Sequence, residues 1–345
     1  GDHSRRDDVA ARSASTPTRN PLAKSHRSMR VLVTGAAGFI GSHLAEALAD
    51  AGHDVTGLDA LTGYYDRSLK RENVGRLAAR GIETARLDLA ADPLGPVLSE
   101  VEAVYHLAAQ PGLSPDTDRR AFVRNNVRAT ERLLDALAGH PHLQAFLFAS
   151  SSSVYGREAT GAEDVELSPA SVYGRTKRRA EAAVRARAAS ERWDSCILRL
   201  FSVYGPRERP DKLIPKALRC ARRGQAFPLF EGSEHHRRSF TYVGDAVEGL
   251  VAALDRFPRC AGQAINIGAP SSTSTLRVLE RVAEVVGRPL CIERRPPRPG
   301  DQQNTRAQIE TARRLLDFAP ATPLRDGIAR EANWLERTRT GQAAP

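Results

Sequence analysis

A tyrosine and a lysine four positions apart, Tyr173 and Lys177, have the types and spacing needed for proton transfer. Positions i and i+4 share a face of a helix, so both side chains can point into one site. An ammonium beside a phenol favours the phenolate, which lowers the tyrosine pKa from about 10. Such a tyrosine can take or return a proton at neutral pH. Because Tyr-x-x-x-Lys also arises by chance in many chains, the surrounding segments must decide its meaning.

A run of four serines at 150–153 precedes this pair and follows an apolar stretch at 146–148. A serine hydroxyl at the end of a strand could hold the substrate oxygen whose proton is moving. Serine runs are more often simple loops, so this feature also depends on its neighbours.

Three glycines spaced three apart, Gly35, Gly38 and Gly41, lie between two regular patterns. An apolar run at 30–34 predicts a buried strand, and residues 42–51 predict a helix. Glycines in this position permit a tight turn and let the backbone approach a pyrophosphate, while the helix N-terminus offers free N–H groups. The spacing is G-x-x-G-x-x-G, which differs from the standard dinucleotide fingerprint G-x-G-x-x-G.

An acidic residue, Asp59, ends the next predicted strand at 54–58 and stands 18 residues after Gly41. A carboxylate in this place can accept hydrogen bonds from a ribose diol and would repel a 2′-phosphate. The residue therefore favours NAD over NADP as cofactor. The alternative interpretation is a turn or helix-cap residue.

Strand and helix patterns alternate over the first 200 residues. Further strands are predicted at 82–87, 103–106, 143–148 and 195–200, and helices at 66–80, 117–138 and 171–189. This alternation predicts an α/β fold, a Rossmann-type doubly wound parallel sheet with helices on both faces. Beyond residue 200 the Pro, Gly and Arg content rises, and helices at 213–223, 244–253, 275–286 and 324–337 predict a smaller C-terminal substrate-binding cap.

Three regions follow from these patterns. Residues 1–28 are polar and lack apolar periodicity, which predicts a disordered leader or a remnant of cloning. Residues 29–200 form the predicted NAD-binding Rossmann domain with the catalytic residues. Residues 201–340 form mainly the nucleotide-sugar-binding cap, interleaved with the last strands of the sheet.

Composition limits the class of protein. At 345 residues, 41% hydrophobic and 27% charged, the chain matches an ordinary soluble globular protein, and no apolar run suggests a membrane span. The four cysteines are widely spaced, which indicates neither a zinc site nor disulfides and predicts a cytoplasmic location. The net charge of +10 is spread along the chain, so it favours a small anionic substrate over nucleic acid. No metal site is predicted.

Several ordered motifs resemble the extended short-chain dehydrogenases/reductases, in the NAD-dependent nucleotide-sugar epimerase/dehydratase group. The resemblance covers roughly residues 30–338. Its motifs are TGAAGFIG at 34–41, DL at 88–89, HLAA at 106–109, NVRAT at 126–130, the serine run with VYG at 154–156, YGRTK at 173–177, RRSFTYV at 237–243 with Asp245, and RPGD at 298–301.

The resemblance implies a role for each matching position. Tyr173 would be the base, Lys177 would also bond the nicotinamide ribose, and Ser151 would be the catalytic hydroxyl. The implied cofactor-binding residues, with Tyr173 and Lys177, are Gly35, Gly38, Phe39, Ile40, Gly41, Asp59, Asp88, Leu89, Leu107, Ala108, Ala109 and Asn126. The implied substrate-binding residues are Ser151, Ser152, Ser153, Ser202, Arg238 and Arg298, the two arginines on the diphosphate of a UDP-sugar. A homodimer through the helices near 117–138 and 171–189 is also implied.

The family shares oxidation of the sugar at C4 and then diverges into epimerases, dehydratases and decarboxylases. Dehydratases resembling this family carry Asp-Glu after the catalytic hydroxyl, and decarboxylases carry Ser-Glu. This chain has Ser152-Ser153 there, and Ser202 where those two groups usually have Asn. Both departures are similar to UDP-glucuronate 4-epimerases, as are the segments YYD at 64–66 and RPD at 209–211.

The sequence therefore predicts an NAD-dependent enzyme that oxidises C4 of a UDP-sugar, with UDP-glucuronate 4-epimerisation as the leading interpretation. UDP-glucuronate decarboxylation stays open, because a β-keto acid can lose CO2 without a dedicated carboxylate. A remote alternative is a non-catalytic NAD-binding sensor, against which the presence of Ser151, Tyr173 and Lys177 together argues.

Overall fold

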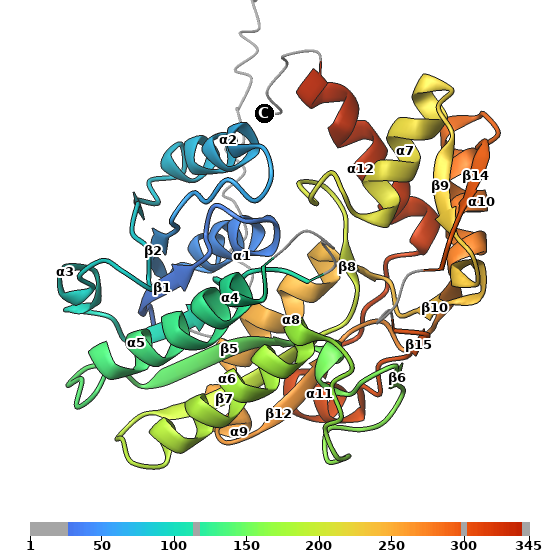
Figure 1. Ribbon diagram of the computed structural model, residues 1–345. Coiled ribbons are helices and arrows are strands. Elements are labelled where there is room, and N and C mark those ends of the chain that lie inside the picture. The colour runs from blue at the N-terminus through green and yellow to red at the C-terminus, as the bar shows by residue number, and fades with distance from the viewer. Residues whose placement is uncertain (1–26, 113–117, 298–301, 340–345) are drawn as a thin grey trace, which may run out of the picture.

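A seven-stranded parallel sheet forms the centre of this computed structural model, which describes residues 27–112, 118–297 and 302–339 (Figure 1). The strand order is β12-β7-β5-β4-β1-β2-β3, which is the doubly wound order that begins in the middle of the sheet. The predicted Rossmann-type fold is confirmed. The strands are β1 (Arg30–Thr34), β2 (Asp54–Leu58), β3 (Thr84–Ala85), β4 (Ala103–His106), β5 (Ala145–Ser151), β7 (Asp194–Leu200) and β12 (Ala264–Ile267).

Helices cover both faces of the sheet, because its strands bury side chains on both sides. In β5, Leu147 faces one core while Phe146 and Phe148 face the other. The first core packs against α1 (Phe39–Asp50), α2 (Arg67–Ala78), α8 (Val243–Asp255), α9 (Phe257–Cys260) and α11 (Glu310–Leu316). The second packs against α3 (Gly95–Leu98), α5 (Ala129–Ala136) and α6 (Val172–Ala188).

The predicted cap has its own hydrophobic core, which includes Ile214, Leu218, Val278 and Ile328. Its elements gather beyond one end of the sheet (Figure 1). They are α7 (Leu213–Arg223), α10 (Thr275–Val286), α12 (Leu324–Arg339), β9 (Phe227–Phe230) and β14 (Ile292–Arg295). Helices α7 and α10 have the predicted bounds.

Short strands connect the cap to the sheet. A four-stranded sheet in the order β13-β10-β15-β6 contains β13 (Thr273–Ser274), β10 (Arg237–Arg238), β15 (Asn304–Thr305) and β6 (Glu158–Ala159). A two-stranded parallel sheet is formed by β11 (Thr241–Tyr242) and β8 (Val203–Tyr204). Because β6 comes from the first half of the chain and β12 from the second, the domain boundary at residue 200 stays a prediction.

Several predicted elements differ from the observed ones by one to three residues at their ends, and two differ more. The strand predicted at 82–87 is only the two residues of β3, which lies at the sheet edge and pairs with β2 alone. The helix predicted at 117–138 contains α4 (Arg119–Phe122), a π-helical stretch (Val123–Arg128) and α5. Such stretches are rare and are frequently found at functional sites. Of the predicted leader, residues 1–26 lie outside the described part of the chain.

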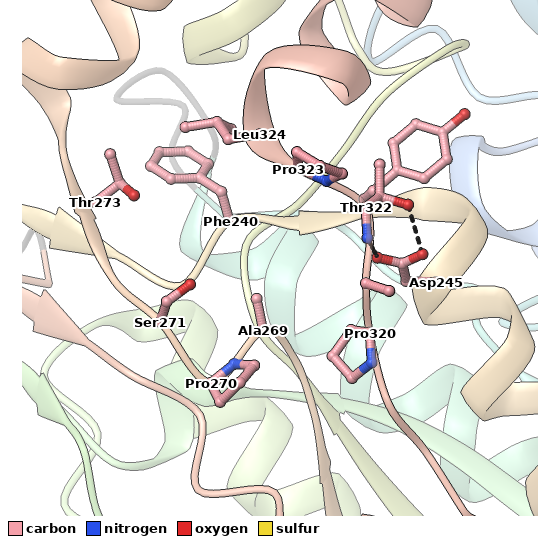
Figure 2. A pocket seen from close by; sticks show the side chains of 12 residues that line it. Phe240, Asp245, Ala269, Pro270, Ser271, Thr273, Pro320, Thr322, Pro323 and Leu324 are labelled. Carbon is pink, nitrogen blue, oxygen red and sulfur yellow. Dashed lines mark hydrogen bonds between the residues drawn. The ribbon is translucent and has the colours of Figure 1, made fainter.

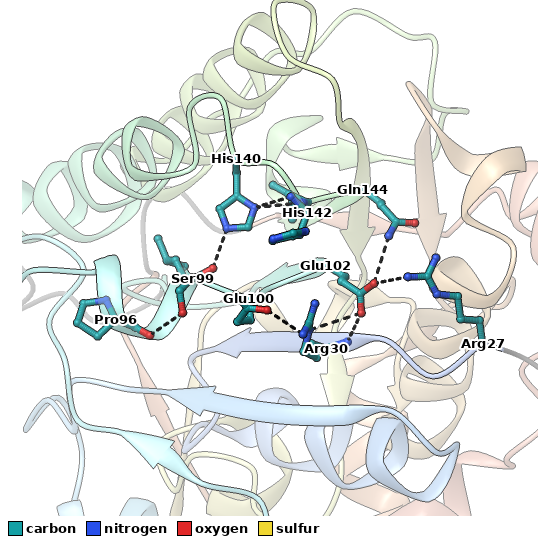
Figure 3. Close-up of polar contacts among 11 residues, drawn as sticks. Arg27, Arg30, Pro96, Ser99, Glu100, Glu102, His140, His142 and Gln144 are labelled. Atoms are coloured by element: carbon teal, nitrogen blue, oxygen red, sulfur yellow. Dashed lines mark hydrogen bonds and ion pairs between the residues drawn. The ribbon is translucent and has the colours of Figure 1, made fainter.

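A buried carboxylate, Glu102, joins the amino ends of the central strands, at the end of the sheet opposite the catalytic motifs (Figure 3). It accepts hydrogen bonds from Arg27 Nη2 at 2.7 Å and from the backbone N of Arg30 at 3.0 Å. The Gln144 side-chain amide donates to it at 3.4 Å. These bonds tie the residues before β1, β4 and β5 together.

Candidate active site

Helix α6 places Tyr173 and Lys177 against the carboxyl end of β5. The helix begins after Ser171, whose hydroxyl accepts a 3.0 Å hydrogen bond from the backbone N of Gly174. Tyr173 is hydrogen-bonded to the Ser151 side chain, and Lys177 Nζ donates to the carbonyl O of Ala149 at 2.7 Å. The structure thus brings the three predicted catalytic residues together, and their catalytic roles stay predictions.

The expected lowering of the Tyr173 pKa is wrong. Burial raises its pKa from 10.0 and outweighs the Ser151 hydrogen bond and the charge of Arg209, which both lower it. Burial also lowers the pKa of Lys177 from 10.5 to about 8. The Lys177 ammonium points at Ala149 O and at the Phe148 ring, 4.7 Å from the ring centroid. The ammonium therefore has little effect on the Tyr173 pKa. Spacing alone does not reveal these competing contacts.

The four serines have different surroundings. Ser150 donates to the buried carboxylate of Glu181 at 2.5 Å. Ser151 and Ser153 lie together on the Tyr173 side, with 3.2 Å between their hydroxyl oxygens. Ser152 is 3% exposed, and its hydroxyl donates to Gln302 Oε1 at 3.4 Å. Ser151 and Ser153 can therefore meet a substrate beside Tyr173, whereas the Ser152 hydroxyl is turned toward the cap.

The glycine turn after β1 fits a dinucleotide pyrophosphate. Gly35 has a φ of +74°, and a Cβ there would lie 2.8 Å from the backbone N of Ala108. A Cβ on Gly41 would collide with the Gly35 carbonyl, and Gly38 is the N-cap of α1. The first turn of α1 leaves the N–H groups of its opening residues, which include Phe39 and Ile40, without intrahelical acceptors. Small side chains and free amides meet where an anion would lie.

Asp59 stands beside this turn with its carboxylate 6% exposed. Its Oδ2 accepts from the backbone N of Ala37 at 3.2 Å, and its Oδ1 accepts from the backbone N of Leu61 at 2.8 Å. Lys70 Nζ lies 3.4 Å from the same Oδ1. The carboxylate therefore supports the glycine turn and is placed as a ribose-binding acidic residue requires.

The other predicted cofactor residues border the same end of the sheet. Asp88 pairs with Arg124 at 2.8 Å, while Leu89 is buried in the second core. Leu107, Ala108 and Ala109 follow β4 and are partly exposed.

Asn126 lies in the π-helical stretch and is 2% exposed. Its Oδ1 accepts from the backbone N of Gln110 at 2.6 Å, and its Nδ2 donates to Thr176 Oγ1 at 3.0 Å. Because the amide is engaged on both sides, Asn126 joins the loop after β4 to the catalytic helix.

The predicted substrate residues on the cap side are placed in part. Ser202 follows β7 and is partly exposed. Arg238 lies on β10, and its Nη1 donates to the carbonyl O of Gln302 at 2.5 Å. Arg298 lies outside the described residues. Gln302 also donates from Nε2 to the carbonyls of Ser152 at 3.1 Å and Gly156 at 2.9 Å, so it joins Arg238 to the serine run.

Arg209 is a site residue to which the sequence interpretation gave no role. Its side chain is buried, its Nη2 lies 3.4 Å from the carbonyl O of Gly112, and its charge acts on Tyr173. Its Nη1 is buried without a hydrogen-bond partner among the described residues. The RPD motif at 209–211 was the available signal, but only the fold shows that it reaches Tyr173.

The loop that carries Arg209 is fixed to the Rossmann domain. Arg207 has a left-handed φ of 71° and forms a 3.0 Å ion pair with Glu46 on α1. His43, also on α1, is hydrogen-bonded through Nε2 to the carbonyl O of Pro206 at 2.9 Å. The loop is therefore fixed to α1, and the Arg209 guanidinium is held by a 3.3 Å ion pair with Asp211 and by the Tyr64 ring, 5.1 Å from its centroid.

Comparisons with known proteins agree with this geometry. Residues 31–268 match the model of the NAD dependent epimerase/dehydratase family. The chain belongs to this family. It is 36% identical to an uncharacterized UDP-glucose epimerase of Bacillus subtilis, over 91% of this chain and 100% of the relative. It is 34% identical to UDP-glucuronate 4-epimerase 3 of Arabidopsis thaliana, over 90% of this chain and 77% of the relative.

A solved structure of this family is also similar. The crystal structure of UDP-glucuronic acid 4-epimerase from Bacillus cereus, in complex with UDP-glucuronic acid and NAD, superposes with a TM-score of 0.85. It shares 34% identity and covers 90% of this chain and 100% of its own.

One hollow of this family member is lined by none of the predicted site residues. The cavity of about 250 Å³ is lined by residues that include Phe240, Pro270 and Leu324 (Figure 2). On its wall, Asp245 accepts hydrogen bonds from Thr322, at 3.0 Å from the backbone N and 2.7 Å from the hydroxyl. Asp245 thus fixes the segment before α12 to the start of α8, which gives this motif residue a structural role.

Two kinds of feature are absent from the described ranges. No helix there is long and apolar enough to cross a membrane. No group of three or more His, Cys, Asp or Glu side chains there could hold a metal ion.

Proposed function

We propose that this chain is an NAD-dependent 4-epimerase of UDP-glucuronate. The observation that carries the choice of sugar is Arg209, a buried guanidinium beside Tyr173 whose Nη1 has no partner among the described residues. A cation held in place next to the base suits a sugar that bears a carboxylate at C6. The names of the Arabidopsis and Bacillus cereus relatives support the same substrate.

In the proposed reaction, Tyr173 takes the proton of the sugar C4 hydroxyl while Ser151 holds that oxygen. NAD, when bound, supplies the hydride acceptor for the oxidation and the hydride donor for the return. The Ser151 hydrogen bond and the Arg209 charge offset part of the cost of forming a buried phenolate. Arg238 and Arg298 would bind the diphosphate, as proposed from the sequence.

Epimerisation requires that the 4-keto sugar keeps its C6 carboxylate. A decarboxylase starts with the same oxidation, but the β-keto acid then loses CO2. A fixed Arg209 beside the carboxylate would oppose that loss, because its ion pair stabilises the charged ground state. Ser153, which stands where decarboxylases carry Glu, offers no second carboxylate near the sugar.

The deciding experiment incubates the protein with UDP-glucuronate and NAD and follows the mass and stereochemistry of the product. We expect unchanged mass and a new C4 isomer. Loss of CO2 would replace the proposal with decarboxylation. Faster turnover of UDP-glucose would favour the substrate in the name of the Bacillus subtilis relative. Absence of turnover with UDP-, dTDP- and GDP-sugars would favour a non-catalytic sensor.

A Tyr173→Phe variant tests the base. We expect a fall in kcat of at least about 100-fold, because the proton acceptor is lost while substrate binding is kept. Tyr105→Phe is the matched control with parental kcat expected, since the buried Tyr105 hydroxyl donates to the carbonyl O of Leu250 at 2.6 Å. Full activity in Tyr173→Phe would refute the proposed role.

Two assignments from the sequence accompany this proposal. A homodimer would bury the helices near 117–138 and 171–189, and light scattering on the purified protein tests that stoichiometry. A cytoplasmic location stays a prediction based on the spacing of the cysteines.

A further inference from the structure

Three residues one turn apart on α6 contact three consecutive residues at the end of β5. Tyr173 is hydrogen-bonded to the side chain of Ser151, the last of the three, and Lys177 donates a hydrogen bond to the carbonyl O of Ala149, the first. Glu181 accepts a 2.5 Å hydrogen bond from the hydroxyl of the middle one. This row of side chains therefore fixes the end of β5, which presents the Ser151 hydroxyl. Glu181 is the one residue of the three to which the proposed reaction gives no role.

The carboxylate of Glu181 is buried, 3% exposed, yet fully paired. Arg199 on β7 donates to it twice, from Nε to Oε1 at 3.1 Å and from Nη2 to Oε2 at 2.9 Å. Arg199 Nη1 donates in addition to the Tyr155 hydroxyl at 2.9 Å. A bidentate pair of this kind holds the carboxylate in one position inside the protein.

Glu181 is also the charge that opposes the effect of burial on Lys177. Burial lowers the Lys177 pKa to about 8, and the negative charge of Glu181 raises it. The other groups that face the ammonium cannot replace that charge. His106 on β4 is neutral because burial and Lys177 lower its pKa to about 3, and Phe148 on β5 offers only its ring. Without Glu181, the Lys177 pKa would fall below 8.

We propose that Glu181 is a positioning residue for the reaction, which keeps Lys177 cationic and orients the end of β5 through Ser150. The inference rests on the proposed function for its kinetic consequence. The effect of Glu181 on the Lys177 pKa can be measured without any sugar. Failure of the inference and failure of the proposed function are therefore distinguishable.

The first test measures the Lys177 pKa directly. The chain contains five lysines, so labelling with ¹³Cε-lysine gives few signals, and Lys177→Met identifies the one required. We expect Glu181→Gln, which keeps the shape and the acceptor for Ser150, to lower the Lys177 pKa by about 1 unit. Glu163→Gln is the matched control, because Glu163 accepts from the backbone N of Asn266 at 2.8 Å, at the far end of the same network.

The second test follows kcat against pH with UDP-glucuronate. We expect the loss of activity at alkaline pH to begin about 1 pH unit lower in Glu181→Gln than in the parent protein. Glu181→Asp, which keeps the charge, should restore most of that difference. Ser150→Ala keeps the charge but frees the strand end, so we expect kcat to fall about tenfold with an unchanged alkaline limit.

Three results would overturn the inference. One is an unchanged Lys177 pKa in Glu181→Gln, and another is an equal shift in Glu163→Gln. The third is parental kcat in Ser150→Ala. If circular dichroism shows that Glu181→Gln does not fold, the Glu181→Asp and Ser150→Ala variants still test the proposal. Parental kcat in Ser150→Ala would contradict it. An alkaline limit about 1 pH unit lower in Glu181→Asp than in the parent protein would contradict it as well.

Discussion

Lys177 Nζ donates a 2.7 Å hydrogen bond to the carbonyl O of Ala149, the residue before the serine run. This bond joins the catalytic helix to the strand that carries Ser151, and Lys177 is 3% exposed. The same burial lowers the Lys177 pKa to about 8. One contact therefore serves both the placement of the site and its response to pH.

Activity should fall as pH rises through about 8. Below that pH Lys177 is a cation, and above it the ammonium loses its proton, because its pKa is lowered rather than raised. The Tyr173 pKa is raised above 10.0, so this residue does not supply the transition. Initial rates with UDP-glucuronate between pH 6 and 10 measure the limit. In Lys177→Arg the cation persists at every pH tested, and any residual activity should lose that limit. A limit near pH 10 in the parent protein would contradict the assignment.

Arg209→Gln should separate the two candidate sugars. Loss of a charge-assisted hydrogen bond costs about 1.5–3 kcal/mol, so the KM for UDP-glucuronate should rise about 10- to 100-fold. UDP-glucose lacks the carboxylate and serves as the internal control, with a much smaller change expected. Steady-state kinetics with both sugars provides the measurement. An equal rise for both would mean that Arg209 only supports its loop against Gly112.

Local patterns predicted the fold well because each element is marked by its own sequence. The strand β4 and the helices α7 and α10 have the predicted bounds, since apolar periodicity and turn residues define them. The glycine turn was equally clear, because no other residue type fits at Gly35 and Gly41. These features depend on neighbours within a few residues.

The site was harder to predict because its chemistry depends on contacts between distant segments. Ser152 turns to Gln302, which is 150 residues away in the sequence. The Tyr173 pKa has the opposite direction from that expected, because burial outweighs the nearby charges. Arg209 lies near Tyr173 through Gly112, which is 97 residues away from Arg209 in the sequence. Arg209 contacts the carbonyl O of Gly112, and the Gly112 Cα packs against the Tyr173 ring. Spacing within one segment contains none of this information.

Glu102→Ala should lower stability without changing kcat. Glu102 is buried and accepts from Arg27 and from the backbone N of Arg30, so its loss leaves that amide without an acceptor (Figure 3). We expect the free energy of unfolding to fall by about 1–3 kcal/mol. Glu100→Ala is the matched control, because the Glu100 side chain is 62% exposed and its 2.9 Å pair with Arg30 is a surface pair. Urea denaturation of both variants measures the difference, and equal effects would show that burial of Glu102 is unimportant.

Gln302→Ala should weaken the connection between the diphosphate side and the sugar side of the site. Gln302 accepts from Arg238 through its carbonyl and donates from its side chain to the carbonyls of Ser152 and Gly156. The substitution keeps the bond to Arg238 but removes the side-chain bonds to Ser152 and Gly156. Because the segment that follows Ser151 then loses its contact with the cap, kcat should fall about tenfold while the Kd for UDP stays unchanged.

Gln303→Ala tests whether this effect is specific to Gln302. The neighbouring side chain is exposed, and its backbone N donates to the carbonyl O of Arg157 at 2.9 Å, a bond that the substitution keeps. Parental kcat is therefore expected. Titration with UDP by calorimetry gives the Kd for both variants, and steady-state rates give kcat. If Gln302→Ala weakened UDP binding and left kcat unchanged, the residue would serve the nucleotide alone and the serine run would be held by α6 without the cap.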